Sequence, residues 1–271
     1  MSLDFTNKGQ CIVMMNDYVA EIVKAYDLAI AKHDDGFLPV TKQRYETPAP
    51  ENLFTVNEDC EKLPKELAAD FHTIVAKMLY VTKRARPDTC LSVAFLTTRV
   101  RTPDRDDWEK LRHLIEYLRK DNIRPLVLGA DNDGLLMWYV DASFAVHPNM
   151  RGHTGGGLTM GRGFPIAVST KQTLNTKSST ESELVGVDDM MPIIIWTRYF
   201  LLSQGYGIVE NLILQDNKSS ILLESNGRAS SSKRTRHINI RYFFICDRVN
   251  MKEVRLHWCP TKEMVADFWT K

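Results

Sequence analysis

The chain has 271 residues, of which 44% are hydrophobic and 25% are charged. These values are ordinary for folded globular proteins and exclude a globally disordered chain. Lys and Arg number 35 and Asp and Glu number 34, so the net charge of +1 neither favours nor excludes a nucleic-acid ligand. The length exceeds the usual size of one domain and predicts two.

The five cysteines are widely scattered and include no Cys-x-x-Cys pair, which disfavours a structural zinc site and is typical of reduced thiols. The first ten residues lack the basic and apolar regions of a secretory signal. Apolar runs such as Met190–Ile195 are too short to span a bilayer. We therefore expect a cytoplasmic or nuclear protein that contacts no membrane.

Residues 1–125 are predicted to be mainly helical, after a weak strand pattern at 9–14. Apolar side chains recur at helical spacing in 17–31, in 66–98 with a break at Pro87, and in 105–120. The stretch 33–65 between the first two is polar and rich in proline, so we predict a linker there. Trp108 and Trp196 fall at helical spacing and are expected in the core.

From residue 126 onward, short strands precede an alternation of helices and strands. The expected strands are 126–128, 135–140, 155–160, 164–169, 212–215 and 253–258, and the expected helices are 179–203, 217–224, 238–250 and a terminal helix from 261. This order predicts an α/β domain over 126–271, with helices on the faces of a mixed sheet.

Three aspartates stand at the ends of predicted elements. Asp141 lies in an apolar strand, where an unpaired carboxylate is costly. Asp216 follows the strand 212–215 at its carboxyl end, where open α/β sheets place ligand sites. Asp267 lies in the predicted terminal helix. Taken singly, Asp216 could be a helix N-cap and Asp141 a turn residue; the set as a whole favours a functional site.

A fourth acid is expected at the start of the helix 179–203, where two glutamates compete. Ser178 and Glu181 fit a capping box, which gives Glu181 a structural role. Glu183 is in line with Val187 on the face that should meet the sheet. We therefore predict that Glu183 joins the three aspartates.

Clustered carboxylates are ligands for hard divalent cations such as Mg²⁺ or Mn²⁺. Two such ions about 4 Å apart can activate a water molecule and stabilise the leaving oxygen of a phosphodiester. The predicted catalytic and metal-binding residues are Asp141, Glu183, Asp216 and Asp267.

The densest basic cluster consists of Lys233, Arg234, Arg236, His237 and Arg241. Such a cluster can neutralise phosphates without reading bases. A nuclear-localisation run or a solvated helix start would also explain it, and His237 could be a capping or packing residue. Lys171, Gln172 and Asn217 lie beside the predicted acids and are further candidates for contact with nucleic acid.

These residues resemble the ribonuclease H domain at the end of Ty1/copia-type retrotransposon polyproteins. The matching stretches follow the family's order and span nearly all of residues 136–271: they are Tyr139–Ser143, Ser169–Gln172, Ser178–Leu184, Gln215–Ser219, Lys233–Ile240, Arg241–Phe243 and Val265–Asp267. Upstream, Ala85–Asp88 and Asp107–Arg119 resemble the thumb and connection of the same elements' reverse transcriptase, and Phe5–Gly9 resembles the end of its palm.

The resemblance implies a ribonuclease H-like mixed five-stranded sheet over 126–271 and a thumb/connection-like region over 1–125. It implies an endonuclease that hydrolyses the RNA strand of RNA–DNA hybrids with two Mg²⁺ or Mn²⁺ ions during reverse transcription. Asp141 would bridge both ions, Glu183 and Asp216 would complete the leaving-group ion, and Asp267 would hold the water-activating ion. The implied partners are the hybrid and the upstream reverse-transcriptase domain of the same polyprotein.

Two departures from related enzymes narrow this interpretation. The Val-Asp-Asp at 187–189 falls in mid-helix, so we expect no polymerase activity from this chain. Residues 259–263 contain no histidine, whereas cellular ribonucleases H carry a histidine-bearing loop there.

One alternative is a catalytically silent retroelement remnant, which retention of all four acids disfavours. Another is an integrase or transposase core with three carboxylates, which the presence of both Glu183 and Asp267 disfavours.

Overall fold

The computed structural model describes residues 1–33, 45–131, 133–226 and 239–271. The chain divides into two compact units, Met1–Leu128 and Gly129–Lys271.

The first unit is mainly helical, as the sequence predicts. Its elements are the antiparallel hairpin β1 (Ser2–Asp4) and β2 (Gln10–Met14), the helices α1 (Asn16–Lys32), α2 (Lys65–Thr82), α3 (Cys90–Thr97) and α4 (Arg105–Lys120), and the 3-10 helix η1 (Pro87–Thr89). Trp108 of α4 is buried among α1 and α2, stacked on Tyr26 and packed against Phe71. The expected break at Pro87 is confirmed, because η1 begins there.

Helix α4 begins at its predicted residue because a reciprocal cap fixes its first turn. The Asp104 carboxylate accepts the amide of Asp107, and the Asp107 carboxylate accepts the amide of Asp104, each at 3.0 Å. The guanidinium of Arg99 donates to both carboxylates, at 3.0 Å and 2.9 Å. This pairing compensates two buried negative charges that the helix dipole alone would stabilise only weakly.

The second unit contains the predicted mixed five-stranded sheet. Its strands are β4 (Leu135–Ser143), β5 (His153–Thr159), β7 (Ile166–Lys171), β8 (Glu210–Gln215) and β9 (Arg255–Trp258), in the order β7-β5-β4-β8-β9. Strand β5 is antiparallel to both its neighbours, whereas β8 is parallel to β4 and to β9. Outside this sheet, the last residues of β3 (Leu126–Ala130) pair with β6 (Gly161–Arg162).

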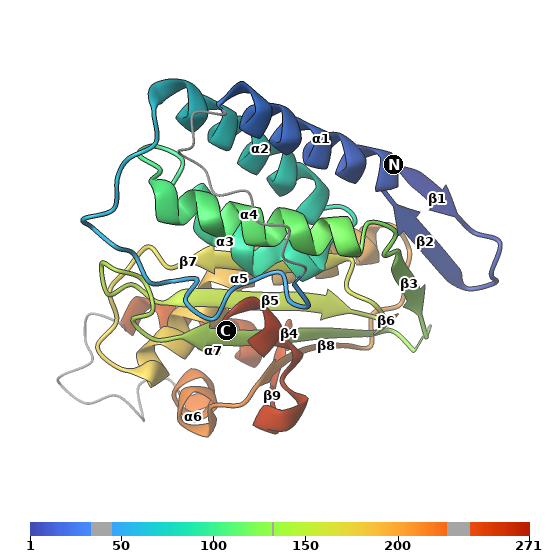
Figure 1. The fold of residues 1–271 in the computed structure, drawn as a ribbon. Helices are drawn as coiled ribbons and strands as arrows, with labels where there is room; N and C mark the ends of the chain where they lie inside the picture. The colour runs from blue at the N-terminus through green and yellow to red at the C-terminus, as the bar shows by residue number, and fades with distance from the viewer. Residues whose placement is uncertain (34–44, 132, 227–238) are drawn as a thin grey trace. The chain divides into compact units, whose positions relative to one another are not determined.

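Helix α5 (Ser179–Ser203) covers one face of this sheet, and α7 (Asn239–Asn250) lies beside it behind the strands (Figure 1). The core between them consists of alternate strand residues such as Trp138 and Ile213, packed on α5 residues such as Met191. Helix α6 (Lys218–Asn226) follows β8. The expectation that Trp196 is a core residue is wrong: its exposed fraction is 56%, because the last turns of α5 direct aromatic side chains to the surface.

The end of the chain lies on the opposite face of the sheet from α5 (Figure 1). A terminal helix was expected from residue 261, but the structure has two short 3-10 helices, η4 (Thr261–Glu263) and η5 (Val265–Trp269). The hydroxyl of Ser143 donates to the Thr270 carbonyl at 2.9 Å, and that of Ser169 donates to the Trp269 carbonyl at 2.8 Å. These sheet hydroxyls satisfy two backbone carbonyls beside η5.

Three consecutive glycines in β5 let both layers approach the sheet. A Cβ on Gly157 would stand 2.6 Å from the Trp269 ring, and a Cβ on Gly156 would stand 2.9 Å from the Met190 side chain of α5. Successive residues of a strand point to opposite faces, so the run leaves room on both.

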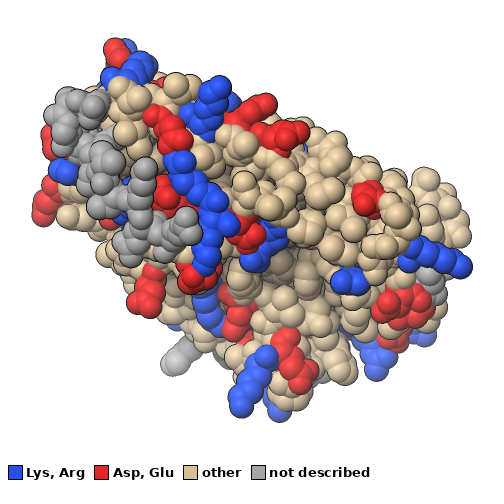
Figure 2. Space-filling view, turned by 45° about the vertical axis from the view of Figure 1, so that its right-hand side comes forward, with Lys and Arg blue, Asp and Glu red and all other residues tan. Residues whose placement is uncertain are grey.

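The surface has mixed charge and all five cysteines are free thiols. Figure 2 shows Lys and Arg side chains interspersed with Asp and Glu over the visible face, rather than gathered by sign. No helix in the described part of the chain combines the length and apolar character needed to cross a membrane.

We predict that Gly157→Ala lowers the free energy of unfolding by about 1–3 kcal/mol, because the new methyl group must displace the Trp269 ring. Gly207→Ala is the matched control, since a Cβ there meets no atom within 4 Å. Urea denaturation of both variants checks this. Equal stability of the two variants would contradict the close packing of the chain's end on β5.

Candidate metal centre

Two of the predicted acids follow the same edge of the sheet. In the parallel pair of β4 and β8, Tyr139 is aligned with Leu214. Two residues further along the chain in each case come Asp141, near the end of β4, and Asp216, directly after β8. Because parallel strands end at the same edge, the two carboxylates come together there.

The third acid comes from the first turns of α5. The hydrogen bonds of the helix cap show which of the two glutamates there, Glu181 or Glu183, has a structural role. The Ser178 hydroxyl accepts the Glu181 amide at 3.2 Å, and the Glu181 carboxylate accepts the Lys177 amide at 2.7 Å. Glu181 therefore stabilises the helix start, as predicted. Glu183, two residues later, is turned inward, with an exposed fraction of 5%.

Asp141, Glu183 and Asp216 form what we call the acidic cluster: one carboxylate oxygen of each lies within 4.8 Å of the other two. Asp141 has an exposed fraction of 2%. The buried Oε2 of Glu183 has no hydrogen-bond partner among the described residues. Three converging oxygens, one of them buried and unpartnered, are a donor set that fits a hard divalent cation.

The acidic cluster is electrostatically strained when no cation is bound. Burial raises the pKa of Glu183 to about 10, and the negative charges of Asp141 and Asp216 add to the shift. Burial also raises the pKa of Asp141, although the Thr270 hydroxyl and the Lys271 ammonium oppose this. A divalent cation would supply the charge that the fully ionised cluster lacks, at the cost of releasing the proton from Glu183.

Asp267, the fourth predicted acid, lies next to the acidic cluster but is not one of its three members. Its negative charge contributes to the raised pKa of Asp141, so the two carboxylates are near one another. Its Oδ1 accepts a hydrogen bond from the Lys271 ammonium at 2.7 Å, and the same ammonium lies 3.8 Å from Asp141 Oδ2. The structure thus brings oxygens of three of the four acids within 4.8 Å of one another and pairs the fourth acid with a lysine.

Several neighbours of the acids were not predicted. Thr261 donates to Asp216 Oδ2 at 2.8 Å, and Thr270 donates to Asp141 Oδ2. Trp258, at the end of β9, donates its indole N–H to the Asp216 carbonyl at 3.2 Å and carries the Lys218 ammonium 4.3 Å above its ring. Threonines and a strand-end tryptophan are too common for the sequence to have indicated these contacts.

The candidates for nucleic-acid contact fall into two groups. Lys233, Arg234, Arg236 and His237 lie outside the described residues, as does the side chain of Arg241 in α7. Lys171 lies at the end of β7, partly exposed. Asn217 accepts the Ser220 amide at 3.1 Å and so caps α6, which leaves the carboxylate of Asp216 to the acidic cluster.

Gln172 is not available to a substrate, contrary to expectation. Its exposed fraction is 1%, and its amide donates to the Thr154 hydroxyl at 3.1 Å and the Ser182 carbonyl at 2.8 Å. Gln172 therefore ties β7 to β5 and to the start of α5. It supports the helix turn that carries Glu183.

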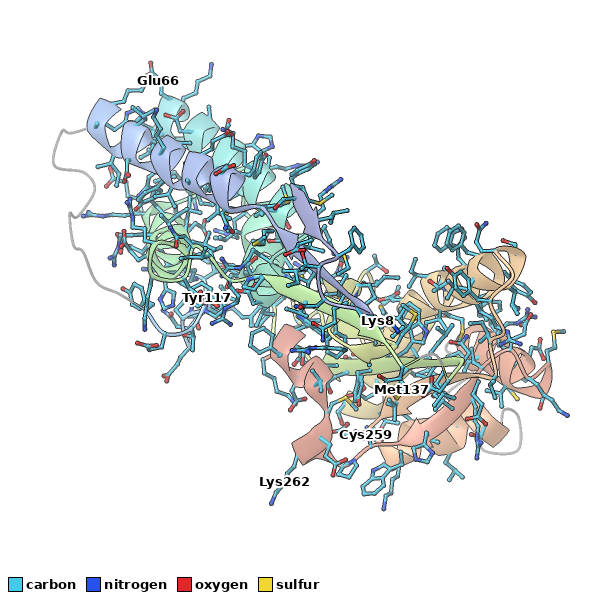
Figure 3. All side chains as sticks on the ribbon, turned by 90° about the vertical axis from the view of Figure 1, so that its right-hand side faces the viewer. Lys8, Glu66, Tyr117, Met137, Cys259 and Lys262 are labelled. Atoms are coloured by element: carbon cyan, nitrogen blue, oxygen red, sulfur yellow. The ribbon has the colours of Figure 1, made fainter. Side chains whose placement is uncertain are left out.

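The segment between β9 and η5 contains no histidine, as the sequence indicates. Cys259 is buried at its start, whereas Lys262 of η4 projects from the ribbon into solvent (Figure 3). Of these residues, Thr261 reaches the acidic cluster, through Asp216.

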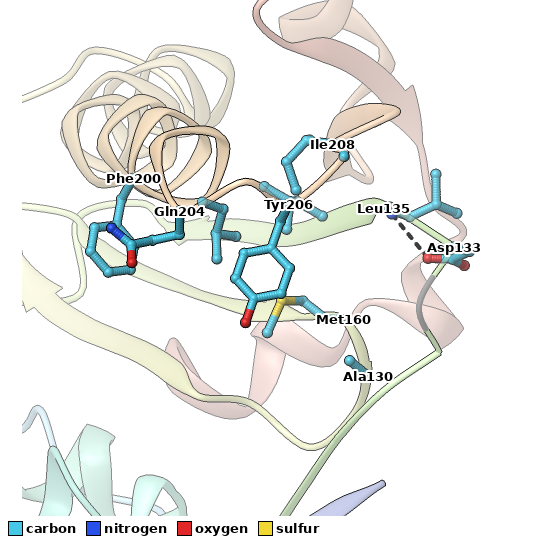
Figure 4. Close-up of a pocket in the computed structure, with 12 residues that line it drawn as sticks. Ala130, Asp133, Leu135, Met160, Phe200, Gln204, Tyr206 and Ile208 are labelled. Carbon is cyan, nitrogen blue, oxygen red and sulfur yellow. Dashed lines mark hydrogen bonds between the residues drawn. The ribbon is translucent and has the colours of Figure 1, made fainter.

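A pocket of about 580 Å³ lies at the other end of β4, around Leu135 and Leu136. Tyr206, Met160 and Phe200 line it, and the Leu135 amide at its rim donates to Asp133 at 2.9 Å (Figure 4). No member of the acidic cluster lines this pocket. It is mainly apolar and separate from the candidate metal centre.

The second unit is an α/β fold with a mixed five-stranded sheet in the order β7-β5-β4-β8-β9 and three acids gathered beside β4 and β8. The chain's homologues are Pol polyproteins of Ty1/copia-type retrotransposons from plants and yeast, which confirms the resemblance found in the sequence. No family model matches the chain.

Three relatives indicate the range of similarity. The chain is 28% identical over 202 residues to the Pol polyprotein of transposon TNT 1-94 from Nicotiana tabacum, covering 74% of this chain and 15% of that protein. It is 27% identical over 212 residues to that of transposon RE2 from Arabidopsis thaliana, covering 78% and 14%. It is 20% identical over 211 residues to the Ty1-JR1 Gag-Pol polyprotein of Saccharomyces cerevisiae, covering 76% and 12%. The chain thus spans a small part of these relatives.

Two solved structures are similar to half of the chain. One is the N-terminal RNase H domain of Rv2228c from Mycobacterium tuberculosis, with a TM-score of 0.32 and 13% identity, covering 50% of this chain and 90% of that chain. The other is RNase H1 of Halobacterium salinarum, with a TM-score of 0.31 and 13% identity, covering 50% and 93%.

We predict that Glu183→Gln stabilises the metal-free protein at pH 8 by about 1–3 kcal/mol. The folded-state pKa of Glu183, about 10, lies above its ordinary value of 4.5. The contribution of Glu183 to the free energy of unfolding is therefore most favourable below about pH 4.5, where this side chain is protonated in both the folded and the unfolded protein. It becomes less favourable as the pH rises toward 10, because the unfolded protein releases this proton more readily than the folded one. The stability difference between variant and wild type should shrink when the pH is lowered from about 8 to 5.5. Urea denaturation in the presence of chelator measures it.

Glu181→Gln is the control, because that carboxylate only caps α5. It should change stability by less than about 1 kcal/mol at either pH. A Glu183→Gln protein no more stable than wild type at pH 8 would contradict the strained cluster.

Proposed function

We propose that this chain is a metal-dependent endonuclease that hydrolyses the RNA strand of RNA–DNA hybrids, as the ribonuclease H component of a Ty1/copia-type retrotransposon. The observation that carries the proposal is the convergence of Asp141, Glu183 and Asp216 within 4.8 Å at one edge of the sheet. The ribonuclease H-like fold and the homology to retrotransposon Pol polyproteins support a role of this type.

The acidic cluster would hold one divalent cation, and Asp141 together with Asp267 would hold a second. Such cations lower the pKa of a water molecule and stabilise the negative charge that develops on the leaving 3′ oxygen. Asp141 would serve both positions, which fits its central place between Glu183, Asp216 and Asp267. Thr261 orients Asp216. Cleavage of this kind leaves a 3′ hydroxyl and a 5′ phosphate.

Binding of the hybrid would rely on its backbone. The basic cluster of Lys233, Arg234, Arg236, His237 and Arg241 would neutralise phosphates, and Lys171 and Asn217 would contact phosphates or 2′ hydroxyls near the acidic cluster. The half-exposed Trp258 borders Asp216, and the Lys218 ammonium lies over its ring. Together they would offer the hybrid an apolar and a cationic surface beside Asp216. None of these side chains needs to read a base edge, as suits a nuclease that selects the shape of the hybrid.

The first unit would act as the thumb/connection region that joins this nuclease to the reverse-transcriptase domain of the same polyprotein, in the cytoplasm or the nucleus. The relatives that the chain matches are Pol polyproteins, which supports this arrangement. The Val-Asp-Asp of residues 187–189 lies in mid-α5 and takes no part in polymerisation under this proposal.

We expect Asp141→Asn to reduce cleavage of a labelled RNA–DNA hybrid by at least about a thousandfold, with Mg²⁺ or Mn²⁺ present. Chelator should abolish cleavage by the wild-type chain. Gel analysis of the labelled RNA strand measures both effects, and circular dichroism checks that the variant is folded.

Asp189→Asn is the control, because Asp189 belongs to the mid-helix Val-Asp-Asp and not to the acidic cluster. It should cleave at the wild-type rate. Cleavage by Asp141→Asn at the wild-type rate would overturn the proposed function. A wild-type chain that binds Mg²⁺ but cuts no hybrid would instead favour the silent remnant.

A further inference from the structure

We propose that Thr270 is a positioning residue that fixes the orientation of Asp141 toward the divalent cation; this inference rests on the proposed function. Thr270 has an exposed fraction of 1%. Its hydroxyl donates to Oδ2 of Asp141, which is itself almost completely buried. A carboxylate with one oxygen held in this way cannot rotate freely, which limits the orientations it can take beside Glu183 and Asp216.

The backbone of Thr270 is held in place by the sheet. Ser143, two residues after Asp141 on the same face of β4, donates to the Thr270 carbonyl at 2.9 Å. Ser169 of β7 donates to the preceding carbonyl, that of Trp269, at 2.8 Å. Residues of two strands, β4 and β7, therefore hydrogen-bond to consecutive carbonyl groups. These bonds restrict the position of the Thr270 backbone and so of the hydroxyl that contacts Asp141.

The sheet is also shaped to receive this threonine. Gly155 of β5 is directly paired with Asp141 of β4. A Cβ on Gly155 would lie 2.5 Å from the Thr270 methyl and 2.9 Å from the Trp269 Cβ. Any larger residue at 155 would push the threonine away from the carboxylate that it contacts.

A chain of hydrogen bonds through the buried side chains of His147 and His153 leads to the Ser169 hydroxyl. His153 Nε2 lies 2.7 Å from the Ser169 hydroxyl, and His147 Nε2 lies 3.0 Å from His153 Nδ1. Because Ser169 donates its own proton to the Trp269 carbonyl, His153 must donate to Ser169 and accept from His147. Burial lowers the pKa of His147 to about 4 and that of His153 to about 3, so both stay neutral near pH 7 and keep this donor order.

A hydroxyl that holds a metal-binding carboxylate has a measurable effect on the metal. Removing such a partner lowers metal affinity by about 10–100-fold even though the ligands themselves are intact. Thr270→Val removes the hydroxyl and keeps the branched shape that fits above Gly155. Thr270→Ser keeps the hydroxyl and loses only the methyl.

The experiment is calorimetric titration of the full chain with Mn²⁺ and with Mg²⁺, together with the metal-induced shift in thermal unfolding. The Kd of Thr270→Val should rise by about tenfold or more, and that of Thr270→Ser should stay within about threefold of wild type. Thr197→Val is the matched control: Thr197 is a buried threonine in α5 whose hydroxyl has no hydrogen-bond partner among the described residues. It should leave the Kd unchanged.

A Thr270→Val protein with the wild-type Kd would overturn the assignment, as would equal losses in the valine and serine variants. A wild-type chain that binds no divalent cation would overturn both this inference and the proposed function. A wild-type chain that binds the cation but cleaves no hybrid would overturn the proposed function alone, and the role of Thr270 in metal binding would stand on the titration.

Discussion

Mutual repulsion among Asp141, Glu183 and Asp216 is the constraint on which the second unit depends. Three carboxylates within 4.8 Å of one another, two of them buried, would separate or take up protons unless the surrounding structure held them. Burial is the largest cause of the rise in the pKa of Glu183 to about 10, and repulsion from Asp141 and Asp216 adds to it. Under the proposed function, a divalent cation would relieve it at neutral pH.

Strand pairing and hydrogen bonds hold each acid of the cluster in place. Asp141 lies near the end of β4 and Asp216 directly follows the neighbouring parallel strand β8, and Glu183 belongs to a capped helix start that Gln172 ties to the sheet. The glycine run of β5 admits α5 on one face and the end of the chain on the other. Residues that are far apart in the sequence, such as Gly155 and Ser169, therefore both contact the Trp269–Thr270 segment, whose Thr270 hydroxyl donates to Asp141.

The parts that could be predicted from the sequence follow local rules. Helices α4 and α5 have the predicted bounds because their caps and apolar periodicity are local signals. Glu183 could be distinguished from Glu181 because the capping box explains one glutamate and leaves the other. Asp141 and Asp216 could be proposed for one site because each stands in or directly after a predicted strand where a carboxylate has no structural role; the parallel pairing that brings them together came from the structure.

The parts that could not be predicted depend on contacts between distant residues. The segment from residue 261 forms 3-10 turns rather than the expected helix, and Ser143 and Ser169, at least 100 residues upstream, donate hydrogen bonds to its Thr270 and Trp269 carbonyls. Gln172 is buried and its side-chain amide donates a hydrogen bond to the Ser182 carbonyl. This contact joins residues of different elements, so no local sequence pattern indicates it. Trp196 is exposed because the last turns of α5 extend past the core, although its spacing fits a buried face.

The most direct test is a crystal structure of the chain grown with Mn²⁺, using the anomalous signal of the metal to locate it. We expect an anomalous peak coordinated by oxygens of Asp141, Glu183 and Asp216, with Thr270 still bonded to Asp141. A structure at saturating Mn²⁺ with no peak between these carboxylates, or with the three side chains pointing apart, would contradict the account.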